Sequence, residues 1–221
     1  MDPVYAWVLP VEQDRRGLAE RLLPVAAAQL LEVPVERVRL VRDGLGRPVT
    51  ELAGQPQEQV WLSASYHAGA LAIAASTAGP VGIDLEGPRS VQLPQLARRW
   101  FGQDEADWLA GRPEADRLKD FLLLWTAKEA FGKALGAGLR GAGLTRRTVL
   151  PPVIGDSLLA GPDGLRLAHP ALAGELVLAV ATGPDVLAED RVVLTDLFAH
   201  DELARSWARS RSSLPVVVRG S

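Results

Sequence analysis

The strongest helical pattern in the chain runs from Asp116 to about Leu135 and stands between two groups of strand-like runs. Side chains at steps of three or four positions share one stripe of this helix, which begins apolar and ends in an acid and a base: Leu118, Leu122, Trp125, Glu129 and Lys133. A long helix placed between strands buries its apolar face against a sheet. The pattern therefore predicts an α+β fold.

The segments before this helix read mainly as strands. Three β-like runs, separated by turn residues, predict a meander of three strands over 60–65, 70–76 and 80–86. Ahead of them, the pattern predicts a helix that is kinked at Pro24, a short strand and a turn, over 12–31, 38–41 and 43–46. The N-terminal half therefore combines one helix with several strands.

The segments on either side of the long helix complete the pattern. Two short helices broken near Gly102 are predicted over 92–110, and a loop rich in Gly and Arg over 136–147. Further strands are predicted over 165–168, 175–182 and 191–195. A last polar helix is predicted over 199–210, and residues 216–218 of the tail could pair at a sheet edge. No repeat and no Pro/Ser-rich linker divides the chain, so we expect two closely apposed subdomains, 1–88 and 89–221.

Composition excludes several functional classes. The 221 residues include no Cys, which rules out disulfides, thiolate metal sites and cysteine nucleophiles, and the three His are scattered. A net charge of −3 gives no reason to expect nucleic acid as a partner. No run of 18 apolar residues and no signal peptide is visible, so we expect no membrane association and a cytoplasmic location. The only lysines are Lys119, Lys128 and Lys133, within fifteen residues of each other.

Two acidic residues lie at the end of the third predicted strand. Asp84 and Glu86 are two positions apart, so both carboxylates project from the same face of a strand. Neighbouring carboxylates repel each other unless a cation or a raised pKa relieves the repulsion. Mg²⁺ takes one or two carboxylates together with substrate phosphates. The alternative is a solvated strand end.

A third acid lies on the long helix. Glu129 continues the apolar stripe, which favours a helix face that opens into a cleft, although an ordinary Glu–Lys surface pair with Lys133 has the same spacing. If Glu129 joins Asp84 and Glu86 around one metal ion, Lys128 and Lys133 supply positive charge for a phosphate. This combination suits phosphoryl or phosphodiester transfer, and no glycine-rich nucleotide loop is present.

Two motifs at a fixed separation carry a family resemblance. The segment Gly82-Ile83-Asp84-Leu85-Glu86 is followed, 41 positions after Asp84, by Trp125-Thr126-Ala127-Lys128-Glu129-Ala130 with Lys133. This pattern resembles the 4′-phosphopantetheinyl transferase superfamily. Three further stretches are similar to the family's motifs: Trp100–Glu105, Gly46-Arg47-Pro48 and Leu62–His67. The resemblance covers roughly residues 40–140, and its strength lies in the paired motifs.

The resemblance implies a fold and a reaction. The chain length matches the long, Sfp-like class, which implies a monomer with two similar α/β subdomains related by a pseudo-twofold axis, each a small, mainly antiparallel sheet packed by a long helix. The implied reaction moves phosphopantetheine from coenzyme A to a serine hydroxyl of an apo acyl- or peptidyl-carrier protein. It depends on Mg²⁺ and releases adenosine 3′,5′-bisphosphate. The carrier could serve fatty-acid, polyketide or nonribosomal peptide synthesis.

The resemblance also implies site residues. Asp84, Glu86 and Glu129 would hold Mg²⁺, Lys133 and Lys128 would contact the pyrophosphate, and Glu129 could be metal ligand, general base or both. Arg47 stands where the family has Lys and would bind the 3′-phosphate. The remaining coenzyme A contacts would come from Ser65, from Tyr66 or His67 in the place of the usual His, and from basic residues near the N-terminus: Arg15, Arg16 and Arg21. The loop after the helix would face the carrier with Arg140, Arg146 and Arg147.

Two other functions use the same residues. A metal-dependent nucleotide phosphodiesterase or pyrophosphatase would need the three acids and a positioned water in place of a carrier. A homologue that binds coenzyme A or a carrier without turnover is the non-enzymatic alternative, and the departure at Tyr66 is its support.

Overall fold

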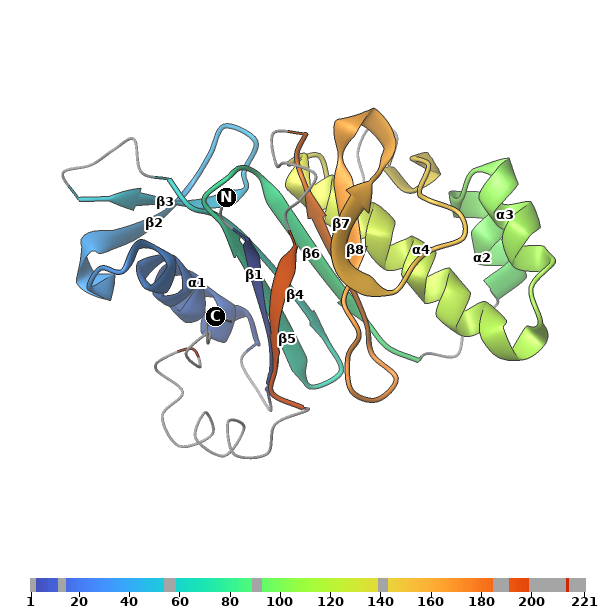
Figure 1. Cartoon of the computed structure of the whole chain (residues 1–221), viewed down its shortest axis with the longest axis horizontal. Helices are drawn as coiled ribbons and strands as arrows, with labels where there is room; N and C mark the ends of the chain where they lie inside the picture. Colours follow the sequence, from blue (N-terminus) through green and yellow to red (C-terminus); the bar gives the residue numbers. More distant parts are fainter. Residues whose placement is uncertain are drawn as a thin grey trace.

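Two β-sheets lie face to face between two helices, α1 and α4 (Figure 1). The structure is a computed structural model, and it describes residues 3–11, 15–53, 59–88, 93–138, 143–184, 191–198 and 214. The two sheets and the four helices α1–α4 confirm the predicted α+β class. Within the described residues, no helix combines the length and the hydrophobicity that a bilayer crossing requires.

The larger sheet has six strands in the order β10-β1-β5-β4-β3-β2. Only the β1–β10 pair is parallel among the paired strands of the described residues. The strands are β1 (Val4–Pro10), β2 (Val38–Arg42), β3 (Pro48–Leu52), β4 (Trp61–His67), β5 (Ala70–Ser76) and β10 (Val192–Asp196). Helix α1 (Arg15–Leu31) covers one face of this sheet and contains Pro24, as predicted. A single 3-10 turn, η1 (Val35–Arg37), leads from α1 into β2.

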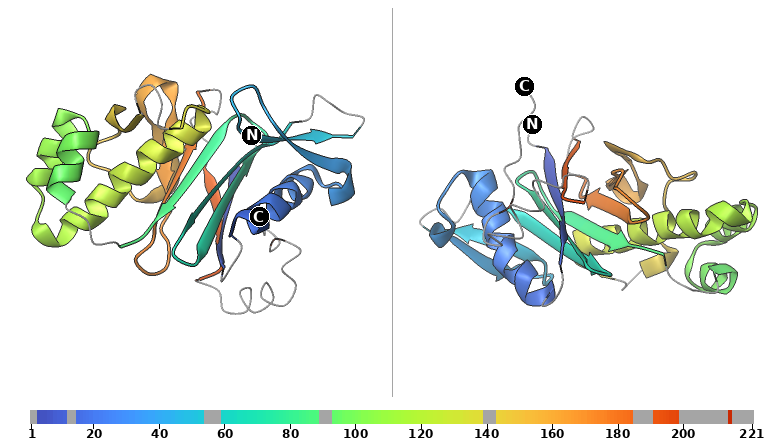
Figure 2. Two further views of the ribbon diagram at one scale, coloured as in Figure 1. Left: turned by 180° about the vertical axis from the view of Figure 1, so that it is seen from behind. Right: turned by 90° about the horizontal axis from the view of Figure 1, so that it is seen from below.

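The smaller sheet has four antiparallel strands in the order β6-β9-β8-β7. They are β6 (Val81–Glu86), β7 (Gly155–Ala160), β8 (Arg166–His169) and β9 (Val177–Thr182). Helix α4 (Glu114–Ala134) packs on its outer face, and the two short helices α2 (Leu93–Trp100) and α3 (Gln103–Ala110) lie beside the first half of α4 (Figure 2). Two 3-10 turns, η2 (Gly143–Thr145) and η3 (Pro162–Gly164), lie in the connections.

The predicted meander is wrong at its third strand. β4 and β5 pair as expected, but β6 leaves the first sheet and pairs with β9 in the second. In return, β10 crosses back and pairs with β1. Each sheet is therefore completed by a strand from the other side of residue 88, and the division into 1–88 and 89–221 stays a prediction.

Three strands were not predicted, and burial explains the first of them. β1 alternates between two cores: Tyr5, Trp7 and Leu9 face α1, while Val4, Ala6 and Val8 face the second sheet. A strand buried on both faces has no polar alternation by which it could be recognised. β3 and β7 are the other two, and they are short or interrupted by polar residues. The predicted last helix over 199–210 and the strand over 216–218 lie outside the described residues.

Helix α4 approaches β6 and β9 closely because the facing residues are small. Ala130 and Ala134 of the helix meet Ala179 and Ala181 of β9. At Gly82 of β6 the helix backbone leaves no room for a side chain, since a Cβ atom there would lie 2.0 Å from the Ala130 carbonyl oxygen. This contact determines how close the charged residues of α4 lie to the end of β6.

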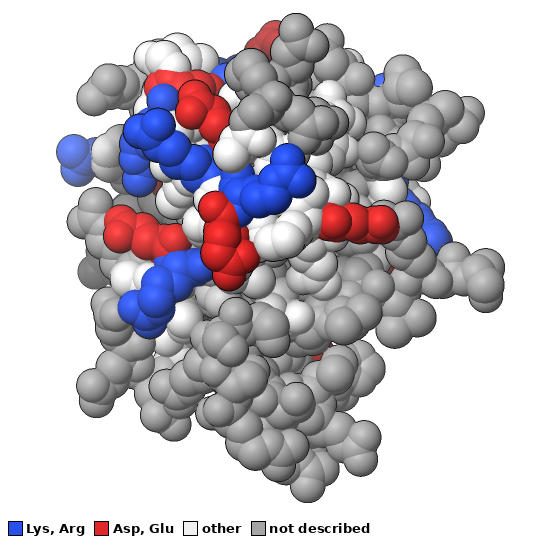
Figure 3. Space-filling view, turned by 90° about the vertical axis from the view of Figure 1, so that its left-hand side faces the viewer, with Lys and Arg blue, Asp and Glu red and all other residues white. Residues whose placement is uncertain are grey.

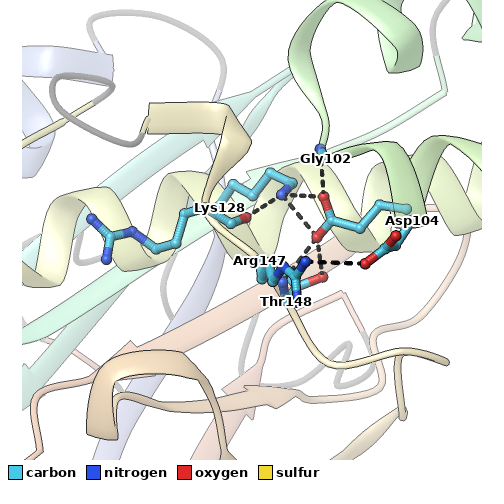
Figure 4. A network of polar contacts seen from close by, with 7 residues as sticks. Gly102, Asp104, Lys128, Arg147 and Thr148 are labelled. Carbon is cyan, nitrogen blue, oxygen red and sulfur yellow. Dashed lines mark hydrogen bonds and ion pairs between the residues drawn. The ribbon is translucent and has the colours of Figure 1, made fainter.

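A buried ion pair joins α3, α4 and the segment after η2 (Figure 4). The Lys128 ammonium, fully buried on α4, donates to both carboxylate oxygens of Glu105, at 2.9 and 2.7 Å, and to the Arg146 carbonyl. Glu105 also accepts hydrogen bonds from the backbone N–H of Gly102 and from the N–H and hydroxyl of Thr148. Burial lowers the pKa of Lys128, and the Glu105 carboxylate opposes that shift. All three N–H donors of Lys128 therefore face groups inside the protein, and its predicted phosphate contact stays a prediction.

We expect Gly82→Ala to destabilise the protein by about 3 kcal/mol, because the helix must move away from β6 to admit the methyl group. In a protein of this size, that change lowers Tm by roughly 6–12 °C. Thermal unfolding followed by circular dichroism measures it. The matched control is Gly44→Ala, where a Cβ atom meets nothing within 4 Å; equal Tm values for the two variants would contradict the close packing.

We expect Lys128→Met to cost about 3 kcal/mol, because it leaves the buried Glu105 carboxylate without its counter-ion. The double variant Glu105→Gln/Lys128→Met should regain a large part of this loss. A double-mutant cycle from urea unfolding gives the coupling energy. The exposed Arg147–Asp104 pair is the control, and Asp104→Asn should change stability by less than about 0.5 kcal/mol. Additive effects of the two core substitutions would show that the pair is uncoupled.

His169 makes stability depend on pH. Its ring is buried and lies 3.0 Å from the Leu123 carbonyl oxygen, and burial lowers its pKa from 6.5 to about 4. Between these two values the unfolded chain binds a proton that the folded protein does not, so stability is lost as the pH falls from 6.5 to 4. The loss is about 3 kcal/mol at the acid end. Urea unfolding across this range should show it, and a His169→Gln variant with the same pH slope would refute the assignment.

Candidate active site

The acidic end of β6 lies against β4, where the two sheets meet. Three alternate residues of β4 contact β6 in turn. Ser63 accepts a hydrogen bond from the Ile83 N–H (3.1 Å), Ser65 donates to Asp84 Oδ1 (2.8 Å), and His67 Nδ1 lies 2.9 Å from Glu86 Oε2. Because alternate residues share one face of a strand, a single register aligns all three contacts.

Asp84 is the most buried of the predicted metal ligands, with 5% of its surface exposed. Its Oδ1 accepts hydrogen bonds from Ser65 and from the Lys133 ammonium, both at 2.8 Å. Its Oδ2 is buried and has no hydrogen-bond partner in the part of the chain that the structure describes. A buried carboxylate oxygen without a partner is costly, so this oxygen is a suitable ligand for a cation.

Lys133, in the last turn of α4, connects the two sheets. Its ammonium donates to the carbonyls of Ile83 (2.8 Å) and Ala64 (3.4 Å) as well as to Asp84. The side chain keeps 28% of its surface exposed and also lines a pocket. Lys133 therefore links the buried carboxylate with a space that a ligand can enter.

That pocket has a volume of about 430 Å³ and lies between α1, the β2–β3 turn, β4 and the end of α4. Its lining includes Arg47, Tyr66 and Lys133 from the predicted site, and also Arg42, Leu45, Gly136 and Gly138. A second cavity of about 380 Å³, between the first half of α4 and the segment 169–178, contains none of the predicted site residues. The first pocket is the candidate site because three predicted residues line it and one of them, Lys133, also contacts Asp84.

The structure separates Tyr66 from His67. Tyr66 is 52% exposed and lines the pocket, whereas His67 points toward Glu86 and does not. Ser65, also predicted to contact coenzyme A, is buried and holds Asp84 instead. Arg16 begins α1, but its side chain lies outside the described residues.

The predicted three-acid metal cage is not preformed. Glu86 pairs with His67, Glu129 is half-buried on α4, and no group of three His, Asp or Glu side chains among the described residues is close enough together to hold a metal ion. Among the buried side-chain atoms that the structure describes, Asp84 Oδ2 is the one carboxylate oxygen without a hydrogen-bond partner. Trp125 of the same motif is half-buried and stacks on Phe121.

Several features of the pocket carry no signal in the sequence motifs. The turn of β2–β3 reaches the end of α4, where a Cβ atom on Gly136 would lie 2.6 Å from that of Leu45. Gly136 has a φ of 66°, which favours glycine, and the two glycines after α4 form one wall of the pocket. Their role follows from a contact between segments about 90 positions apart, which periodicity cannot reveal.

Comparisons with known proteins agree with these motifs. The family model of the 4′-phosphopantetheinyl transferase superfamily matches residues 80–163. A putative 4′-phosphopantetheinyl transferase of Synechocystis is 31% identical over 178 residues, which cover 76% of this chain and 67% of that protein. The 4′-phosphopantetheinyl transferase psf-1 of Bacillus pumilus is 31% identical over 153 residues, covering 69% of this chain and 63% of the relative. The Sfp enzyme of Bacillus subtilis matches over a shorter stretch, 73 residues at 34% identity, covering 33% of this chain and 32% of Sfp.

The match to the family model spans β6, α4 and the segment between them, the part of the chain that carries Asp84, Glu129 and Lys133. The long Synechocystis match extends the likeness across most of the chain. On this evidence the chain belongs to the 4′-phosphopantetheinyl transferase superfamily.

Proposed function

We propose that this protein transfers the 4′-phosphopantetheine group of coenzyme A to a serine hydroxyl of an apo carrier protein. Relatives that this chain matches in sequence are named 4′-phosphopantetheinyl transferases, after this transfer. The observation that carries the proposal is the buried Asp84 carboxylate, with one oxygen held by Lys133 and Ser65 and the other without a partner, at the edge of a pocket with further cationic residues. We propose a monomer, acting in the cytoplasm, with subdomains 1–88 and 89–221.

The residues present suit a magnesium ion. Mg²⁺ binds through one or two carboxylates and leaves its other positions to water and substrate phosphates, so it does not need a complete protein cage. Asp84 Oδ2 would be one ligand, and Glu86 and Glu129 would be the others. When bound, the ion would offset negative charge on the pyrophosphate and on the leaving group.

The protein's own residues would perform the remaining steps. The serine oxygen forms a bond to the β-phosphorus of coenzyme A, and the bond from that phosphorus to the bridging oxygen breaks. Adenosine 3′,5′-bisphosphate leaves with the electron pair. Glu129, one helical turn before Lys133 on α4, would accept the serine proton. Lys133, whose ammonium pairs with Asp84 in this structure, would bind the pyrophosphate through its positive charge.

Tyr66 and Arg47 complete the proposed coenzyme A site. Tyr66 lies on the exposed wall of the pocket, in the place of the family's usual His, and offers a hydroxyl in place of an imidazole. Arg47 also lines the pocket, where its guanidinium donates to Asp43 and to the Ala134 carbonyl. Both residues would contribute to the binding of coenzyme A, whereas Asp84, Glu129 and Lys133 would take part in the bond-forming step.

The test is the mass of a carrier protein. The full chain is incubated with coenzyme A, Mg²⁺ and a panel of apo carriers, and each carrier is weighed by intact mass spectrometry. A gain of one phosphopantetheine group supports the proposal. Hydrolysis of coenzyme A without a carrier would point to a phosphodiesterase, and binding without either product would point to an inactive homologue.

We expect Asp84→Asn to reduce the rate of transfer at least about a hundredfold, because the amide keeps the shape of the side chain but loses its charge. The folded structure should be retained, since an amide oxygen can still accept the Ser65 hydrogen bond. The control is Asp156→Asn on the exposed face of β7, with the wild-type rate expected. A normal rate for Asp84→Asn at limiting Mg²⁺ would refute the assignment of Asp84.

A further inference from the structure

The hydroxyl of Ser65 contacts the Asp84 carboxylate from inside the protein. Ser65 lies on β4 with 8% of its surface exposed, and its Oγ donates to Asp84 Oδ1 at 2.8 Å. Its neighbours Ala64 and Tyr66 line the candidate pocket, whereas Ser65 does not. The hydroxyl therefore faces the carboxylate and not the space in which a ligand would lie.

The two donors to Asp84 Oδ1 differ in their freedom to move. Lys133 keeps 28% of its side chain exposed and lines the pocket, so its long side chain can carry the ammonium toward a phosphate. Ser65 has a short side chain on a strand that pairs with β5, and one dihedral angle sets the position of its Oγ. Ser65 is therefore the donor that can stay on Oδ1 when Lys133 turns to a ligand.

A fixed donor on one oxygen determines where the other oxygen points. The terminal torsion of an aspartate is broad, so the plane of a carboxylate is free to turn unless a directional contact restricts it. The hydrogen bond from Ser65 to Oδ1 supplies that restriction. Oδ2, which is buried and has no hydrogen-bond partner within the described ranges, is thereby held in one orientation.

The surrounding surface carries no charge of a single sign that could take the place of this orientation. Figure 3 shows basic and acidic side chains interspersed on the end that carries the β2–β3 turn, which forms part of the pocket wall. Long-range attraction of a cation by a patch of one sign is therefore weak here. The affinity for a cation has to come from the ligand atoms and from the groups that orient them.

We propose that Ser65 is a positioning residue: its hydroxyl fixes the plane of the Asp84 carboxylate and leaves Oδ2 to bind a divalent cation. The inference rests on the proposed function, which places Mg²⁺ at Asp84. Hydrogen bonds to ligating carboxylates orient them, and loss of such a partner typically weakens metal binding by about 10- to 100-fold. This role differs from the coenzyme A contact that the family resemblance implies for Ser65.

The test is binding of Mn²⁺ to the full chain, followed by the electron paramagnetic resonance signal of the free ion. Mn²⁺ has the charge of Mg²⁺ and takes the same oxygen ligands. The site is identified as the Mn²⁺ binding that Asp84→Asn removes. Ser65→Ala should raise the Kd of this site about tenfold. The same variant should leave the Kd for coenzyme A, measured by calorimetry without metal, within about twofold of the wild-type value.

Ser63→Ala is the matched control. Ser63 is also a buried serine of β4, and its hydroxyl contacts a backbone group of β6, the Ile83 N–H, in place of a carboxylate. Its loss loosens the same strand contact, so Tm should fall as it does in Ser65→Ala. The Kd for Mn²⁺ should nevertheless stay within about twofold of the wild-type value, because the donor to Asp84 is retained.

The outcomes separate this inference from the function on which it rests. An unchanged Mn²⁺ Kd in Ser65→Ala would overturn the inference, as would an equal loss in Ser63→Ala or a wild-type chain without a site that depends on Asp84. Weaker binding of coenzyme A by Ser65→Ala without metal would show that Ser65 contacts the ligand, which also overturns it. If the Mn²⁺ results are as expected and no apo carrier gains mass, the proposed function fails and the role of Ser65 stands.

Discussion

The close approach of α4 to β6 determines the geometry of the whole site. With a glycine at position 82, the helix lies against the strand backbone, and the last turn of the helix reaches the place where the two sheets meet. There Lys133 contacts one strand from each sheet and the buried Asp84 carboxylate. A wider helix–strand spacing would remove the ammonium from this junction and leave a buried charge uncompensated.

Two of the three lysines of α4, Lys128 and Lys133, share a local geometry that explains why lysine occurs at these positions. All but three of the 24 basic residues are Arg. Lys128 and Lys133 each direct three N–H donors at three acceptors around a compact ammonium, Lys128 in the core and Lys133 between the strands. A planar guanidinium is too wide and presents its donors in a fork, so it would not satisfy either arrangement.

The helices and most strands could be predicted from the sequence because each has a period or a turn signal of its own. β1 could not, because burial on both faces removes its alternation, and the departure of β6 from the meander depends on pairing with a strand about 100 positions later. Within the site, the motif spacing led to Asp84 and Lys133. It also suggested Lys128, whose ammonium faces Glu105 because of the packing of α3, a tertiary contact that spacing does not encode.

The exchange of strands between the sheets has a consequence for synthesis on the ribosome. β6, which carries Asp84, acquires its neighbour β9 only when residues 177–182 have emerged, and β1 has an open edge until residues 192–196 arrive. A nascent chain that stops short of these residues exposes unpaired backbone groups along two strands, which other chains can bind. Both sheets are thus completed only after residue 196 has been synthesised, and termination before that point should favour aggregation over folding.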